Sequence, residues 1–280
     1  MQVIQDMCLI TIMMNAVLKS QTAHSHQIII PSTIFNTLES SFDPSQYNHD
    51  IAQALLALSL AVTHATYTLQ NFNINTTVNI PLNFSVCPVL SVDNAGSFGN
   101  ILFHNNILYI IFSGTADSCM TSVDLTYKQI PLNTIFNSTV EMKCHQGFIS
   151  AYNTVRDVII DACHQYQPEK VYITGHSLGG ALSSICALDL ASMQPIHYSF
   201  ASPMVFNPIA AQTFNQLVDN SFRIANISDL VTIAPLPIMP NNDLFAHIGH
   251  NIIFQTNTGD YIANHTQAYI DQYSISTVKD

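Results

Sequence analysis

The chain has 280 residues, of which 48% are hydrophobic and 9% charged, so it is long enough to bury a large core without metal or disulfide support. Its formal net charge is −11, and its seven Lys and Arg residues are scattered along the sequence. Nucleic acid phosphates require clustered basic side chains, so this composition excludes a nucleic-acid partner.

Residues 1–45 are predicted to be an N-terminal extension of unknown role, followed by one domain over residues 46–280. Within the extension, residues 7–18 (MCLITIMMNAVL) are apolar enough for a signal-peptide core, but Asp6 precedes them and no Lys or Arg does. A buried or interfacial helix is the alternative, and the localisation stays open. No apolar run is long enough to predict a transmembrane span.

Helices and strands are predicted to alternate through the rest of the chain. Residues 51–69 favour a buried helix, and residues 101–112 favour a hairpin that turns at Asn105–Asn106 and has a continuously apolar second strand. Helices then follow at 147–166 and 178–192, and strands at 171–174, 196–201, 222–227 and 248–255. This order predicts an α/β fold with a mostly parallel central sheet and helices on both faces.

The cysteines and the sequons predict little. The six cysteines include no CxxC pair, so a structural zinc site is not predicted. A Cys119–Cys144 disulfide is an open alternative. Cys163 and Cys186 are expected to be buried thiols on helix faces. Chance predicts roughly four Asn-x-Ser/Thr sequons in such a composition, so those present do not indicate secretion. They begin at Asn75, Asn83, Asn137, Asn226 and Asn264.

The segment Gly175-His-Ser-Leu-Gly-Gly180 lies between a predicted buried strand and a predicted helix. This is the context in which a G-x-S-x-G sequence forms a nucleophile elbow, because the glycines relieve collisions in a sharp turn. The pattern predicts that Ser177 is a nucleophile. A glycine-rich turn without chemistry is the alternative.

Several further segments, in a consistent order, resemble the class 3 (fungal-type) lipases. They are Phe112-Ser-Gly-Thr115, His145-Gln-Gly-Phe148, Phe200-Ala-Ser-Pro203, Arg223-Ile-Ala-Asn226 with Asp229-Leu-Val231, Pro235-Leu-Pro237, His247-Ile-Gly249 and Asn264-His265 with Tyr269. Ser113 departs from the family pattern, which has Arg there, and so does the segment after Pro203. The resemblance implies the α/β-hydrolase fold and ester hydrolysis by a Ser-His-Asp triad, without a cofactor or a metal.

The acid is predicted to be Asp229, since no Glu follows Ser177 and Asp229 comes directly after a strand. Asp189 and Asp219 are interpreted as solvated surface charges. The base is predicted to be His265, in a loop after the last strand, and the resemblance selects the same two residues. His197 is expected to pack inside a strand.

The remaining histidines are assigned other roles. His247 and His250 form an HxxH pair that lacks a third ligand, so no metal site is predicted. His145 and His176 are expected to support the site through hydrogen bonds.

Backbone N–H groups of Thr115 and Leu178 are predicted to form the oxyanion hole. Residues 116–128, directly after Thr115, are a candidate lid over an acyl pocket, and an ordinary surface loop is the alternative. The candidate lid residues are Ala116, Met120, Val123, Leu125 and Tyr127.

These features predict a carboxylic ester hydrolase that acts on lipid, such as a triacylglycerol lipase or a phospholipase, at a membrane or emulsion interface. A catalytically inactive relative that binds lipid or protein, and an esterase for small feruloyl-type esters, are the alternatives. Fold and catalytic residues specify the reaction class but not the substrate.

Overall fold

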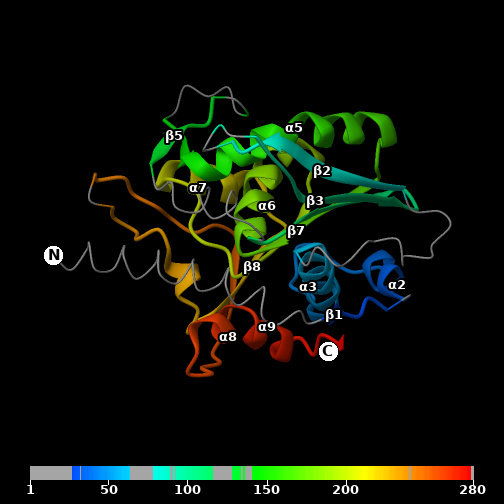
Figure 1. Cartoon of the computed structure of the whole chain (residues 1–280). Helices are drawn as coiled ribbons and strands as arrows, with labels where there is room; N and C mark the ends of the chain where they lie inside the picture. Colours follow the sequence, from blue (N-terminus) through cyan, green and yellow to red (C-terminus); the bar gives the residue numbers. More distant parts are fainter. Residues whose placement is uncertain are drawn as a thin grey trace.

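The structure, a computed structural model, describes residues 27–31, 33–63, 78–88, 91, 93–115, 128–133, 135, 141–239 and 241–278. Within these ranges a seven-stranded sheet runs through the centre of the domain, in the order β10-β9-β8-β7-β4-β3-β2 (Figure 1). Its strands are β2 (Val78–Val86), β3 (Asp93–His104), β4 (Ile107–Phe112), β7 (Lys170–His176), β8 (Ile196–Phe200), β9 (Ser221–Asn226) and β10 (His250–Phe254). Neighbours from β4 to β10 pair in parallel, while β2 and β3 are antiparallel. The predicted mostly parallel sheet is therefore confirmed.

Helices cover both faces of this sheet (Figure 1). One face carries α5 (Gln146–Tyr166), α6 (Leu178–Asp189) and α7 (Pro208–Leu217), and the other carries α2 (Ile34–Glu39), α3 (His49–Thr63), α8 (Tyr261–His265) and α9 (Gln267–Gln272). Alternate residues of β4 feed two separate cores: Ile110 packs with the first group of helices and Tyr109 with the second. All six residues of β4 are buried, as expected for a central strand.

Shorter elements complete the described chain. They are β1 (Gln27–Ile28), β5 (Gln129–Pro131), β6 (Lys143–His145), β11 (Thr277–Val278) and two 3-10 turns, η2 (Ala191–Met193) and η3 (Leu230–Ile233). β1 pairs with β11, and β5 pairs with β6. Residues 7–18 lie outside the described residues, and the domain boundary near residue 45 stays a prediction. No helix within the described ranges combines the length and hydrophobicity that a bilayer crossing requires.

Local sequence signals explain where several elements begin and turn. Asn105 and Asn106 have φ angles of 48° and 61°, the left-handed conformation that a two-residue hairpin turn requires. Helix α7, which the sequence analysis did not predict, starts with the side chain of Asn207 accepting the Ala210 N–H at 2.9 Å and Pro208 in the first turn.

Asp189 was wrongly interpreted as a solvated surface charge. Its carboxylate is buried between α5 and α6, where it accepts hydrogen bonds from Arg156 Nε at 2.7 Å, Arg156 Nη2 at 2.9 Å and Tyr152 OH at 2.7 Å. The cation that pairs with this carboxylate lies on the neighbouring helix α5, where the sequence of α6 alone does not reveal it.

The cysteines in the described part of the chain fall into two groups. Cys144, Cys163 and Cys186 are buried free thiols, so the Cys119–Cys144 disulfide is excluded and the expectation for Cys163 and Cys186 is confirmed. Cys87, at the end of β2, is disulfide-bonded, which the sequence analysis did not predict.

Candidate active site

Ser177 lies in the sharp turn between β7 and α6, with φ 60° and ψ −124°. This strained backbone is held by a hydrogen bond from the Ser177 N–H to the Phe200 carbonyl of β8, 2.9 Å long. A Cβ atom on Gly175 would lie 2.2 Å from the backbone of Gly179, and one on Gly179 would lie 2.5 Å from the carbonyl oxygen of Phe112. Only glycine at both positions allows the helix to approach the sheet so closely.

The structure brings Ser177, His265 and Asp229 into one hydrogen-bonded chain. Ser177 Oγ lies 2.7 Å from His265 Nε2, and His265 Nδ1 lies 2.9 Å from Asp229 Oδ2. A carboxylate can only accept, so Nδ1 carries the hydrogen and Nε2 is free to accept the serine proton. All three side chains are at most 5% exposed. His265 is the last residue of the short helix α8, so the prediction that it lies in a loop was wrong.

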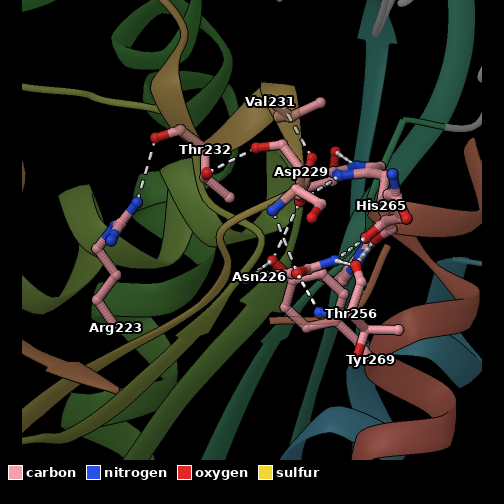
Figure 2. A network of polar contacts seen from close by, with 12 residues as sticks. Arg223, Asn226, Asp229, Val231, Thr232, Thr256, His265 and Tyr269 are labelled. Atoms are coloured by element: carbon pink, nitrogen blue, oxygen red, sulfur yellow. Dashed lines mark hydrogen bonds and ion pairs between the residues drawn. The ribbon is translucent and has the colours of Figure 1, made fainter. Parts of the chain in front are cut away.

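The carboxylate of Asp229 is held by three donors. Besides His265, the Val231 N–H donates to Oδ1 at 3.0 Å and Tyr269 OH donates to Oδ2 at 3.1 Å (Figure 2). Burial raises the pKa of Tyr269 well above its ordinary value, so its hydroxyl stays protonated and remains a donor. The same hydroxyl accepts the Asn226 N–H at 2.8 Å, which ties the end of β9 to α9.

Asn226 connects the segments that carry Asp229 and His265. Its amide nitrogen donates to the carbonyls of Thr256 at 2.8 Å and Asn264 at 3.1 Å, and its amide oxygen accepts the N–H groups of Thr256 and Ser228 (Figure 2). The side chain is completely buried. In the folded protein this sequon is therefore a structural element rather than a surface site for a glycan.

The two predicted oxyanion-hole residues follow the carboxyl ends of neighbouring strands. β4 and β7 pair through Phe112 and Gly175, so Thr115 and Leu178 emerge from the same edge of the sheet. Thr115 is 3% exposed, and Leu178 is the first residue of α6, a position whose N–H has no acceptor within its own helix. The candidate lid residues Ala116, Met120, Val123, Leu125 and Tyr127 lie outside the described residues.

The predicted supporting histidines are both buried, but only His176 lies next to the elbow. His176 Nε2 donates to the carbonyl of His265 at 2.8 Å, linking the residue before Ser177 to the residue predicted as base. His145 accepts the Phe148 N–H through Nδ1 and caps α5, and burial lowers its pKa to about 3.

A second serine–histidine pair lies away from any carboxylate. His197 packs inside β8 as predicted, with Ser183 Oγ at 3.0 Å and Ser221 Oγ at 2.8 Å from its two ring nitrogens. Burial lowers the pKa of His197 to about 3. Its two ring nitrogens contact hydroxyls rather than a carboxylate, so an imidazolium here would lack the charge stabilisation that an acid-paired histidine has.

In the described part of the chain, no three His, Cys, Asp or Glu side chains are grouped as metal ligands. His247 instead lies 3.1 Å from the guanidinium of Arg223 through Nε2. The groups that meet at Ser177 are its hydroxyl, an imidazole that can take its proton, and a buried carboxylate that can stabilise the resulting cation. Such an arrangement can carry out nucleophilic attack on a carbonyl carbon.

The sequence analysis missed two residues that shape this site. Tyr269 was noted only as a family landmark. Its position four residues after His265 could have indicated that it lies near the site. The hydroxyl of Thr63 contacts the backbone next to Thr115. No sequence motif around Thr63 indicates that this residue lies near a site.

Comparison with known proteins identifies similar sequences. The family model described as lipase (class 3) matches residues 109–239. A lipase of Rhizomucor miehei is 31% identical over 142 residues, covering 46% of this chain and 37% of the relative. A lipase of Caenorhabditis elegans is 28% identical over 216 residues, covering 71% of this chain and 60% of the relative. The alignments thus span less than two thirds of either relative.

Solved structures show the same fold. A mono- and diacylglycerol lipase from Aspergillus oryzae superposes with a TM-score of 0.59 at 20% identity, covering 84% of this chain and 87% of the other. A triacylglycerol lipase described as having a serine protease triad at its catalytic centre superposes with a TM-score of 0.57 at 22% identity, covering 76% and 83%. The expected α/β-hydrolase fold is confirmed.

Proposed function

We propose that this chain, whose residues 109–239 match the class 3 lipase family model, is a serine hydrolase that cleaves carboxylic esters of lipids. The observation that carries the proposal is the continuous hydrogen-bonded chain from Ser177 through His265 to Asp229. Ser177 precedes α6, Asp229 precedes η3 and His265 ends α8, so three separate elements bring these side chains together, and the packing of the core does not require that alignment.

In the proposed mechanism Ser177 Oγ attacks the ester carbonyl while His265 Nε2 takes its proton. The carbonyl oxygen becomes an oxyanion, which the N–H groups of Leu178 and Thr115 stabilise. His265 then gives the proton to the departing alkoxide, leaving an acyl group on Ser177. Water, deprotonated by His265, hydrolyses this acyl-enzyme and restores the free serine.

Labelling with a fluorophosphonate probe tests the nucleophile. The wild type should be labelled and Ser177→Ala should not, with turnover of p-nitrophenyl esters reduced on the order of 10⁶-fold. Ser183→Ala is the matched control, since it removes a buried serine hydroxyl from a histidine that has no acid partner. An unlabelled, inactive wild type would support the inactive-relative alternative, and labelling that survives in Ser177→Ala would move the nucleophile elsewhere.

The assignment of the base and acid needs separate variants. His265→Ala should lose about as much activity as Ser177→Ala, and combining the two should add little, because the residues act together. Asp229→Asn should fold yet turn over slowly, because the wrong histidine tautomer is favoured. If His250→Ala were the inactive variant instead, the base would be misplaced.

Lipid substrates at an interface are the proposed substrate class, with residues 116–128 as the lid. Activity on long-chain esters should then rise once the substrate exceeds its solubility limit. Met120→Asp should lower activity on emulsions and spare soluble short-chain esters. Equal activity on dispersed and soluble substrates would favour the small-ester esterase.

A further inference from the structure

The backbone next to the proposed oxyanion donor Thr115 leaves the sheet before it reaches that residue. Strand β4 ends at Phe112, and the Ser113 N–H still reaches β3 through the Phe98 carbonyl at 2.9 Å. The following N–H, that of Gly114, is buried and has no strand to pair with. A buried N–H needs an acceptor, and the direction of that acceptor orients the peptides on either side of it.

The acceptor comes from the last residue of α3, far away in the sequence. Thr63 Oγ1 accepts the Gly114 N–H at 2.8 Å and donates to the Ser59 carbonyl, one turn back in its own helix, at 2.8 Å. A hydroxyl has one hydrogen, so donation to Ser59 turns a lone pair toward Gly114. Thr63 is 6% exposed, and water therefore does not compete for this acceptor.

Gly114 is also confined by contacts on two sides. A Cβ atom there would lie 3.3 Å from Thr63 Cγ2 and 3.3 Å from the His176 carbonyl, the residue before the nucleophile. The turn that carries Thr115 is thus clamped between the end of α3 and the nucleophile elbow. The hydroxyl of Thr63 fixes its orientation, and the methyl group fixes its distance.

We propose that Thr63 is a positioning residue for the oxyanion hole: its hydrogen bond to Gly114 holds the neighbouring Thr115 N–H in place. This proposal rests on the ester hydrolysis proposed above. Stabilisation of an oxyanion depends on donors fixed before charge develops, and a displacement of about 1 Å can cost on the order of 10²-fold in rate. Thr63 touches no reacting atom. Its loss should therefore change transition-state binding and leave ground-state binding of the substrate unchanged.

Thr63→Val tests this, because it keeps the shape and removes the acceptor. We expect kcat on p-nitrophenyl esters to fall about tenfold to a hundredfold with KM nearly unchanged, and Thr63→Ser to restore kcat close to wild type. Affinity for an alkyl boronic acid, which forms a tetrahedral adduct with a serine, should weaken in step with kcat/KM. Thr63→Cys, whose thiol is a weaker acceptor, provides the comparison if Thr63→Val does not fold.

Ser59→Ala is the matched control, since Ser59 Oγ is buried one turn earlier in α3 and bonds only to the Leu56 carbonyl. It should lower the melting temperature without changing kcat. Wild-type kcat in Thr63→Val, or a Thr63→Ser variant as slow as Thr63→Val, would overturn the positioning role. A wild type that neither turns over esters nor reacts with the fluorophosphonate would instead overturn the proposed function itself.

Discussion

Replacing Tyr269 by Phe should weaken both the fold and the proposed catalytic carboxylate. The hydroxyl donates to Asp229 Oδ2 at 3.1 Å and accepts the Asn226 N–H at 2.8 Å, and the side chain is completely buried. A bond to a charged group contributes about 1.5–3 kcal/mol, and Asn226 would keep an unsatisfied buried N–H. We expect a loss of about 3 kcal/mol in the free energy of unfolding, which lowers the melting temperature by roughly 6–12 °C.

The same substitution should lower kcat about tenfold, because the carboxylate would be less firmly oriented when His265 becomes charged. Tyr273→Phe is the control: Tyr273 is also buried on this side of the sheet, but its hydroxyl bonds to Tyr47 OH at 2.8 Å rather than to Asp229. Calorimetry and ester hydrolysis measure the two effects. If Tyr269→Phe matched Tyr273→Phe in both, the contact with Asp229 would have no energetic importance.

Two further predictions concern stability. Asp189→Asn should lower the free energy of unfolding by about 2 kcal/mol, measured by urea titration. The loss should be smaller than for a fully buried ion pair because Arg156 is 29% exposed. An unchanged urea midpoint would show that the pair contributes nothing. Burial lowers the pKa of both His145 and His197 to about 3, so between pH 6.5 and 3 the unfolded chain binds protons that the folded chain does not. The stability that these two groups contribute is complete above pH 6.5. Below that pH the free energy of unfolding should fall by about 1.4 kcal/mol per pH unit for each histidine. His197→Gln should therefore reduce the pH dependence of the free energy of unfolding by the contribution of one histidine. A slope equal to that of the wild type would contradict the assignment for His197.

The amino-acid sequence alone determined the order of the main elements and the place of the elbow. The apolar run 107–112 and the contact of Gly175 with Gly179 involve neighbours a few residues away, so the sequence pattern reveals them without knowledge of the fold. Candidate acids and bases were also few enough in number for chain order to select Asp229 and His265.

Only the tertiary structure decided which groups meet across long separations. Ser177 and His265 are 88 residues apart, and Tyr269 lies 40 residues from the carboxylate that it contacts. Asp189 appeared solvated because its cation lies on another helix. Asn226 appeared to be a chance sequon because the hydrogen bonds of its side chain to Ser228, Thr256 and Asn264 form only in the folded chain. Hydrogen bonds of this kind depend on the packing of whole elements, which no local pattern of residue types records.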